Sequence, residues 1–287
     1  MSGSRRITIA VAQAPFGDDT ETNVARAESL VREAAGAGAT LIVLPELFAS
    51  PYFCREERED LFDLAAPDDG HPLIERFTAL SGELGIVMPV SFFERDGQAY
   101  YNSVAVVDSG RRLAGVYRKS HIPDGPGYEE KFYFRPGDTG FRVWDTSAGC
   151  VGVGICWDQW FPEAARAMVL AGADVLVYPS TIGSEPDDPG LDTREPWRRV
   201  MIGHAVANAV PVVAANRTGV EGGQSFYGQS FIADERGDTI ADLGDTERGA
   251  ALATVDLDAI RRYRASFGFF RDRRPDLYAG LVEKKRG

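Results

Sequence analysis

The residues GVGICWDQWFPEAARAM (152–168) give the clearest indication of the fold. The apolar run 151–155 is rich in β-branched residues and bounded by glycine, which predicts a buried strand. Pro162 and Glu163 suit the first turn of a helix, where proline lacks only an amide that would be unpaired and a carboxylate meets the positive end of the helix dipole. Cys156 is therefore expected where a central strand ends and a helix begins.

A thiol at such a turn is held by a rigid strand and faces the amide-rich start of a helix, which favours the thiolate. The same strand–turn–helix arrangement presents the nucleophilic serine of other hydrolases. The common alternative is that Cys156 is a buried cysteine with a purely structural role. The rest of the chain decides between these two interpretations.

The 287 residues carry a net charge of −12. This charge argues against nucleic acid or an anionic membrane as a partner. Without linkers or repeats, we expect one domain over residues 1–287, with a core at about 5–262 and a tail, 263–287, at an interface. The chain contains no apolar run of about 18 residues, the length that a membrane span needs, and no apolar leader at its start. We therefore expect a cytoplasmic protein.

Cysteine and histidine usage argues against a metal centre. Cys54, Cys150 and Cys156 have no framework spacing, and the three histidines form no HExxH pair. The glycine motifs of dinucleotide and phosphate sites and the GxSxG of serine hydrolases are also missing. We expect neither a metal nor an organic cofactor, and we interpret Cys54 and Cys150 as structural.

Strands and helices alternate in part of the chain and strands pair as hairpins elsewhere, which predicts an α/β layered fold with mixed sheets. Thr20 and Asp192 are candidate N-caps, and the long loop 122–140 is expected to be functional. The predicted strands are 7–14, 40–44, 86–94, 100–108, 112–117, 141–145, 150–155, 174–178, 211–215, 226–234 and 250–255, and the predicted helices are 20–35, 71–84, 163–170, 193–208 and 256–264.

Three of these strands end beside a reactive side chain: Glu46, Lys119 and Cys156. Ligands gather at the carboxyl ends of strands in sheet proteins. A thiol needs a base, and the anionic intermediate of acyl transfer needs a donor, so a carboxylate, an ammonium and a thiol would form a coherent site. Glutamate and lysine are commonly surface residues, but Glu46 follows a fully apolar strand, where a charge needs a partner.

The stretches LIVLPELF, YRKSHIPDGPGYEEKFYF and GVGICWDQWFPEAARAM resemble those of the nitrilase (carbon–nitrogen hydrolase) superfamily, and the resemblance extends from ITIAVAQ to FRDRRPDLY. It implies a four-layer αββα sandwich that assembles into homo-oligomers. It also implies that Glu46 is the general base, Lys119 stabilises the oxyanion and Cys156 is the nucleophile. Glu130 matches the second acid of the superfamily, and the adjacent Glu129 is the alternative.

The stretches IGSEPDDPGLD and FGFFRDRRPDLY are similar to those of superfamily members that hydrolyse N-carbamoylputrescine, a carbamoyl amine, to putrescine, ammonia and carbon dioxide. The ammonium end of this substrate needs apolar walls and an acid. The expected walls are Trp157, Tyr52 and Tyr128. Glu185 is the first candidate for the ammonium partner and Asp124 the second.

Several alternatives stay open at this point. Glu185 could be a solvated loop acid in a run with other acids. An N-carbamoyl-β-alanine or N-carbamoyl amino acid substrate would need an arginine, and Arg194 and Arg217 are available. A small aliphatic amide is a further possible substrate, and a non-catalytic binding module would have no use for Lys119 and Cys156 together. His121 is interpreted as a loop-packing residue rather than the base of a Cys–His pair.

Overall fold

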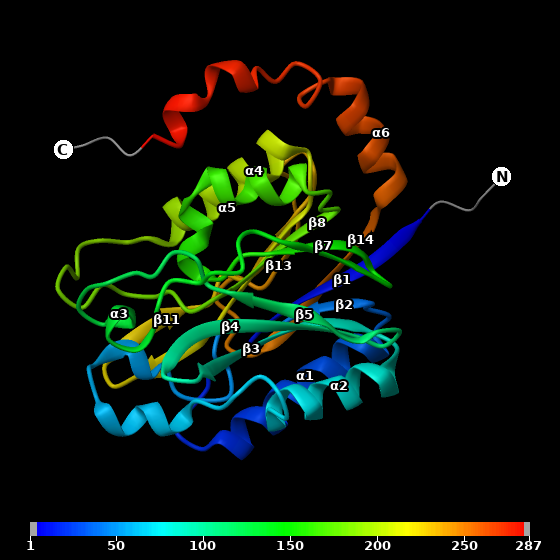
Figure 1. The fold of residues 1–287 in the computed structure, drawn as a ribbon. Coiled ribbons are helices and arrows are strands. Elements are labelled where there is room, and N and C mark those ends of the chain that lie inside the picture. Colours follow the sequence, from blue (N-terminus) through cyan, green and yellow to red (C-terminus); the bar gives the residue numbers. More distant parts are fainter. Residues whose placement is uncertain (1–4, 284–287) are drawn as a thin grey trace.

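In the computed structural model, which describes residues 5–283, two six-stranded sheets pack face to face (Figure 1). The first sheet has parallel central strands flanked by antiparallel ones. Its strand order is β14 (Gly249–Asp256), β1 (Arg6–Gln13), β2 (Leu41–Val43), β3 (Val87–Asp96), β4 (Ala99–Asp108) and β5 (Arg112–Arg118).

The second sheet repeats this plan, with three parallel strands in its centre. Its strand order is β13 (Thr239–Asp242), β12 (Phe231–Ala233), β9 (Val212–Asn216), β8 (Val175–Ser180), β7 (Gly149–Val153) and β6 (Val143–Thr146). A separate hairpin is formed by β10 (Thr218–Glu221) and β11 (Gln224–Tyr227).

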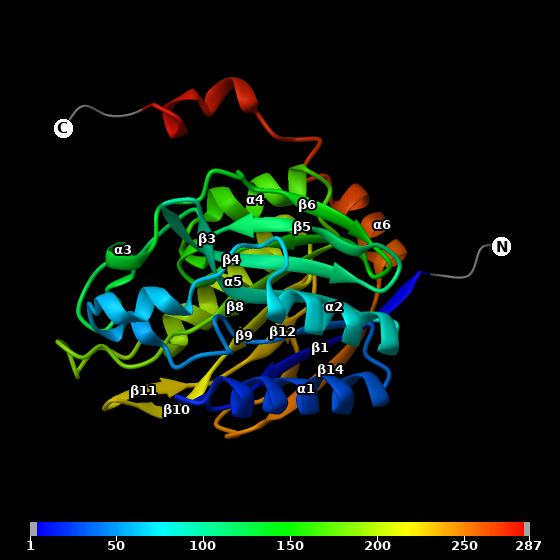
Figure 2. The same cartoon turned by 60° about the horizontal axis from the view of Figure 1, so that its bottom comes forward.

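Helices cover the outer face of each sheet (Figures 1 and 2). The first sheet is covered by α1 (Thr20–Gly36) and α2 (Pro72–Leu84), and the second by α4 (Pro162–Leu170) and α5 (Arg194–Asn208). The order of layers is therefore αββα, which confirms the predicted fold. The remaining α-helices, α3 (Glu130–Tyr133) and α6 (Leu257–Phe267), lie outside these layers.

Three apolar cores separate the four layers. Val43, Val104 and Val153 belong to the core between the sheets. Phe77 belongs to the core beneath α1 and α2, and Trp197 to the core beneath α4 and α5. The central strands are buried on both faces, which explains why β2 and β8 read as continuous apolar runs rather than alternating ones.

The predicted elements are found, with local differences at their ends. Asp19, not Thr20, caps α1, because its carboxylate accepts the Thr22 amide at 2.8 Å. At the start of α5, Asp192 accepts the Arg194 amide at 3.0 Å, while Thr193 occupies the cap position. In both places two neighbouring side chains could serve as the cap.

The strand predicted over 226–234 is divided into β11 and β12, because Gly228 and Gln229 both adopt left-handed backbone conformations that turn the chain. The strands β10 and β13 were not predicted. Between β7 and α4 the chain forms a 3₁₀ helix, Cys156–Trp160, so the turn after the strand is longer than expected. Residues 49–69 contain two further 3₁₀ helices, Phe53–Arg55 and Glu59–Leu64.

The tail runs beside α4 and α5 (Figure 1). It contains the 3₁₀ helices Pro275–Leu277 and Ala279–Leu281, and its last residues, 284–287, lie outside the described part of the chain, as do 1–4. Across residues 5–283, no helix is long and apolar enough to cross a membrane.

Candidate active site

The site lies at the seam where the strand ends of the two sheets meet. Glu46 follows β2 and Lys119 follows β5 in the first sheet, whereas Cys156 follows β7 in the second. Hydrogen bonds cross the seam at Glu46, where its amide donates to Ser180 O at 3.3 Å and its carbonyl oxygen accepts from Thr181 Oγ1 at 3.1 Å. The carboxyl ends of strands from both sheets therefore converge, as the sequence predicted.

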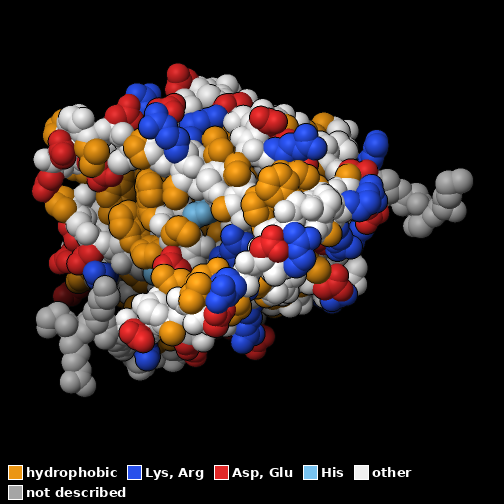
Figure 3. All heavy atoms as spheres, turned by 90° about the horizontal axis from the view of Figure 1, so that it is seen from above, with side chains coloured by type: hydrophobic (Ala, Val, Ile, Leu, Met, Phe, Trp, Pro, Cys, Tyr) orange, Lys and Arg blue, Asp and Glu red, His pale blue; other side chains and the backbone are white. Residues whose placement is uncertain are grey.

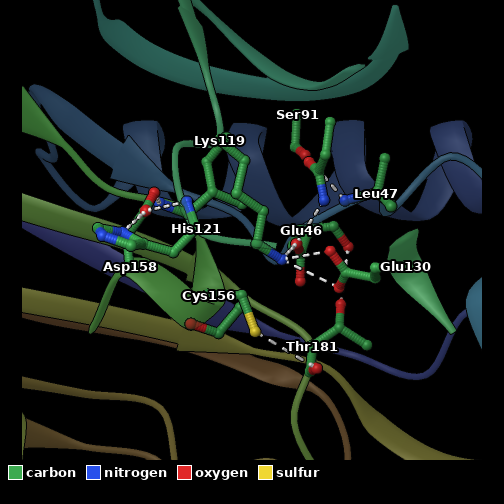
Figure 4. A network of polar contacts seen from close by, with 12 residues as sticks. Glu46, Leu47, Ser91, Lys119, His121, Glu130, Cys156, Asp158 and Thr181 are labelled. Carbon is green, nitrogen blue, oxygen red and sulfur yellow. Dashed lines mark hydrogen bonds and ion pairs between the residues drawn. The ribbon is translucent and has the colours of Figure 1, made fainter. Parts of the chain in front are cut away.

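Lys119 is the centre of the polar network (Figure 4). Its Nζ atom lies 2.9 Å from Glu46 Oε1 and 2.9 and 2.7 Å from the two oxygens of Glu130, and all three side chains are fully buried. Burial alone would lower the pKa of the Lys119 ammonium, but the carboxylates of Glu130 and Glu46 outweigh it and raise the pKa well above its ordinary value. Both carboxylates thus favour the charged form of Lys119.

Glu46 is held through one of its two carboxylate oxygens. Oε1 accepts hydrogen bonds from Lys119 Nζ and, at 2.7 Å, from Asn102 Nδ2. Oε2 is buried and has no hydrogen-bond partner within residues 5–283. A buried carboxylate oxygen without a partner is costly unless it has a use, and this one is free to accept a proton.

Glu130, rather than Glu129, joins the network. Tyr52 donates its hydroxyl hydrogen to Glu130 Oε1 at 2.7 Å, and Lys119 binds both oxygens. Burial raises the pKa of Glu130 to about 7, although the Lys119 ammonium opposes this shift. The Glu129 side chain is only half-buried, while its amide donates to Cys54 O at 2.7 Å.

Cys156 sits in a strained turn beside this network. Its backbone φ of 40° is in the left-handed region, which is unusual for a residue with a side chain. Gly154 makes the turn possible, because a Cβ atom there would lie 2.6 Å from the Tyr178 ring. The thiol donates to Thr181 O at 3.6 Å, and its sulfur faces the same space as Lys119 and the two carboxylates (Figure 4).

The electrostatic expectation for Cys156 was wrong. Burial, and next the carboxylate of Glu46, raise the pKa of this thiol well above its ordinary value, and Lys119 only partly opposes them. The resting side chain is therefore a neutral thiol rather than the thiolate that a helix start would favour. A base is needed to remove its proton.

Asp158 ties the cysteine turn to the end of β5. Its carboxylate accepts the Ile155 amide at 3.0 Å, Tyr117 OH at 2.7 Å and the His121 amide at 3.0 Å. His121 Nδ1 lies 2.7 Å from the same carboxylate, and the His121 ring stacks on Phe161. His121 is thus a packing residue, as expected.

A cavity of about 280 Å³ opens onto Cys156. Trp157, Tyr128 and Thr181 line it beside the cysteine, and four acids line it as well: Asp124, Glu185, Asp187 and Asp188. Glu185 is half-buried, and burial followed by the nearby Asp188 raises its pKa. The acids make this cavity suited to a cation.

Tyr128 does more than line the cavity. Its hydroxyl accepts the Gly183 amide at 2.9 Å and donates to Ser184 O at 3.2 Å, so it holds the loop that carries Glu185. Tyr52, in contrast, is fully buried and absent from the cavity lining. Its predicted role as a wall is corrected, because its ring packs against Tyr128 and Phe226 and its hydroxyl is bonded to the Glu130 carboxylate.

Neither candidate arginine is available for a substrate carboxylate. Arg194 is paired with Asp192 at 2.6 Å outside the cavity. Arg217 is fully buried, pairs with Glu221 at 2.6 Å and donates to the Glu46 and Leu47 carbonyls. Both guanidinium groups already have anionic partners.

Sequence patterns did not identify two residues of the site, Asn102 and Asp158, or the supporting role of Arg217. Asn102 is a lone amide within an apolar strand, which is a signal of a buried hydrogen bond. Arg217 directly follows the buried strand β9, the same position that identified Glu46 and Cys156. In the part of the chain that the structure describes, no three His, Cys, Asp or Glu side chains are arranged to hold a metal ion.

Comparison with known proteins identifies the family. The sequence profile of the family described as Carbon-nitrogen hydrolase matches residues 8–265. An N-carbamoylputrescine amidase from Arabidopsis thaliana is 55% identical over 286 residues, covering 97% of this chain and 96% of that protein. A citrullinase from Francisella tularensis subsp. tularensis is 49% identical over 282 residues, covering 97% and 99%. The crystal structure of a carbon–nitrogen hydrolase from Helicobacter pylori G27, 37% identical, aligns with a TM-score of 0.91 over 97% of this chain and 99% of that chain. This chain therefore belongs to the carbon–nitrogen hydrolase family.

Proposed function

We propose that this protein hydrolyses N-carbamoylputrescine to putrescine, ammonia and carbon dioxide. The observation that carries the proposal is the cavity in which Cys156 lies among acidic side chains. Membership of the family supports cleavage of a carbon–nitrogen bond, and relatives at 55% identity are named for this substrate. The acids support a substrate with a cationic end.

The reaction begins with transfer of the thiol proton to a carboxylate. Because the Cys156 thiol is neutral at rest, Glu46 accepts its proton through the unpartnered Oε2 as sulfur attacks the ureido carbonyl. A carbon–sulfur bond forms and the carbonyl π bond opens, which places a negative charge on oxygen. Lys119 and the Trp157 amide stabilise that oxyanion.

The intermediate then collapses. The carbon–nitrogen bond breaks as Glu46 returns the proton to the leaving nitrogen, so that an amine or ammonia departs and a carbamoyl thioester remains on Cys156. Glu46 next accepts a proton from water, which attacks the thioester. The thiol is regenerated, and the released carbamic acid yields carbon dioxide and the second nitrogen product. Glu130 holds Lys119 in place through both of its carboxyl oxygens.

Recognition of the substrate's far end is assigned to Glu185, with Asp124 as a second acid. Glu185 is half-buried in the cavity wall, where an ammonium gains more from a carboxylate than it would in water. Asp124 lies 3.8 Å from Lys131, which partly neutralises it. Trp157 and Tyr128 supply apolar surface for the four-carbon chain.

Substrates that end in a carboxylate fit this cavity less well. Carboxylates of N-carbamoyl-β-alanine or an N-carbamoyl amino acid would meet the acids without an arginine, since Arg194 and Arg217 are paired elsewhere. Citrulline also carries a carboxylate, but its ammonium makes it a zwitterion. The citrullinase relative makes citrulline the second substrate to test.

The test is ammonia release from N-carbamoylputrescine, citrulline, N-carbamoyl-β-alanine and a small aliphatic amide, with Cys156→Ala as the blank. Preference for N-carbamoylputrescine that is lost in the blank supports the proposal. Glu185→Gln should raise KM for N-carbamoylputrescine and leave KM for the neutral amide unchanged. Asp192→Asn is the matched control, because Asp192 lies on the same loop outside the cavity. Preference for citrulline would keep the chemistry and reassign the substrate.

We also propose that the protein is a cytoplasmic homo-oligomer formed from a single domain with its tail at an interface. Apolar side chains gather on the face that carries α4, α5 and the tail (Figure 3), and a groove of about 720 Å³ opens between these elements. Leu277, Leu281 and Val282 are exposed there. Leu281→Asp should shift the sedimentation coefficient towards the monomer; an unchanged value would contradict this interface.

A further inference from the structure

Arg217 is a fully buried cation outside the cavity. It follows β9 directly and lies among the rings of Phe16, Tyr52 and Phe226. A buried guanidinium needs its charge and its donors satisfied. Its Nη1 atom is paired with Glu221 Oε1 at 2.6 Å.

The two terminal nitrogens of Arg217 also hold the turn that carries Glu46, whereas its Nε atom has no hydrogen-bond partner within residues 5–283. Nη2 donates to Glu46 O at 3.2 Å and to Leu47 O at 3.0 Å, and both terminal nitrogens lie 3.4 Å from Ser50 O. Within this turn Leu47 adopts a left-handed backbone conformation, with φ of 48°. A planar fork of donors can serve several carbonyls at once, which a lysine ammonium on a flexible stem does less well.

Glu221 connects the ion pair to Glu130, the second carboxylate of the site, through Tyr52. Its Oε2 atom accepts the Tyr52 amide at 2.6 Å, and the Tyr52 hydroxyl donates to Glu130 at 2.7 Å. Glu130 binds Lys119, and Lys119 binds Glu46, whose carbonyl returns to Arg217. The contacts form a closed ring of buried groups.

We propose that the Arg217–Glu221 ion pair is a positioning pair. Arg217 fixes the backbone of Glu46, and Glu221 fixes the backbone of Tyr52 and, through the Tyr52 hydroxyl, Glu130. This inference rests on the proposed roles of Glu46 and Glu130. Arg217 contacts the backbone carbonyl of Glu46 and not its carboxylate, and it does not line the cavity. It therefore neither binds substrate nor takes part in proton transfer.

The first variant removes the pair without leaving an unpaired charge: Arg217→Met together with Glu221→Met. Arg198→Met is the matched control. Arg198 also pairs with a carboxylate, that of Asp242 at 2.5 Å, and donates to a backbone carbonyl, that of Gln229 at 3.1 Å, but it lies away from the site. Two readouts are taken on folded protein: kcat and KM for N-carbamoylputrescine, and the rate at which iodoacetamide alkylates Cys156.

The double variant should lose about a hundredfold in kcat with KM nearly unchanged, because a small misplacement of reacting groups costs this much. Alkylation of Cys156 at neutral pH should slow about tenfold, and the deficit should narrow as pH rises and hydroxide replaces Glu46 as the base. Arg198→Met should leave both readouts within about twofold. A folded double variant with wild-type kcat and wild-type alkylation would overturn the inference.

Two further arms keep the test decisive. If the double variant does not fold, Glu221→Gln takes its place, because an amide has one acceptor oxygen and cannot serve Arg217 and Tyr52 equally. It should lower kcat about tenfold without raising KM, and an unchanged kcat would again overturn the inference. If wild-type protein does not hydrolyse N-carbamoylputrescine, the proposed substrate fails, while the alkylation rates still test the positioning pair.

Discussion

Lys119 engages only one of the two carboxylate oxygens of Glu46: its Nζ atom lies 2.9 Å from Oε1, and Oε2 is buried without a hydrogen-bond partner among residues 5–283. A base that shared both oxygens with an ammonium would be a poor proton acceptor. Because the two oxygens have separate roles, the Glu46 carboxylate can bind the ammonium through Oε1 and exchange protons with the thiol and the leaving group through Oε2.

Glu46→Gln removes the proton acceptor and retains the shape of the side chain. We expect kcat to fall by about 10² to 10⁴, the usual contribution of a general base, with little change in KM. Steady-state ammonia release measures this effect. Glu129→Gln changes a half-buried side chain outside the hydrogen-bond network of Lys119, so it serves as control and should keep kcat within about twofold. Equal losses in the two variants would argue against the assignment of Glu46.

Asp158→Asn tests the anchor of the cysteine turn. The carboxylate accepts hydrogen bonds from Ile155, Tyr117 and His121, and an amide has only one oxygen with which to replace them. A buried donor left unpaired costs about 1–3 kcal/mol, so the free energy of unfolding in urea should fall by about that amount. His121→Phe keeps the stack on Phe161 and should cost less. A larger loss for His121→Phe would contradict the central role of Asp158.

Buried histidines should make the protein less stable in mild acid. Burial lowers the pKa of His71 and His204 from their ordinary value of 6.5. Below that value the unfolded chain binds protons that the folded chain does not, so stability is full above about pH 6.5 and is lost as pH falls. His71 caps α2 through an unprotonated Nδ1, which accepts the Leu73 amide at 3.2 Å.

The variant His71→Asn retains a capping acceptor that does not titrate. Compared with this variant, the wild type should lose melting temperature as pH is lowered from about 7 to about 5. Contributions from other groups are common to both proteins and cancel in the difference. Parallel curves for the two proteins would contradict the prediction.

Glu130 should have the opposite pH dependence. Burial raises the pKa of its carboxyl to about 7 from an ordinary 4.5. Between these values the unfolded chain is ionised while the folded chain retains the proton, so stability falls as pH rises through this range. The difference in free energy of unfolding between the wild type and Glu130→Gln should favour the wild type most near pH 4.5 and should decrease as pH rises to about 7. Urea unfolding at several pH values measures this, with Glu163→Gln on the exposed face of α4 as control.

The features that sequence could predict are those that depend on local pattern. Apolar runs followed by Glu46, Lys119 and Cys156 located the site, because parallel strands bring their carboxyl ends to one edge. Tyr52 and the pKa direction of Cys156 could not be inferred in this way. The first depends on which face of a loop packs against Glu130, and the second on two carboxylates that are distant in sequence and buried beside the thiol.

The arrangement of Glu46 and Lys119 on one sheet and Cys156 on the other has a consequence for inactivation by heat or denaturant. Each sheet retains its own hydrogen bonds when the two are slightly displaced, whereas the reacting atoms lose their alignment. Turnover should therefore vanish at a lower temperature than the far-ultraviolet circular dichroism signal. In this protein, loss of activity should therefore report displacement of the two sheets before either sheet unfolds.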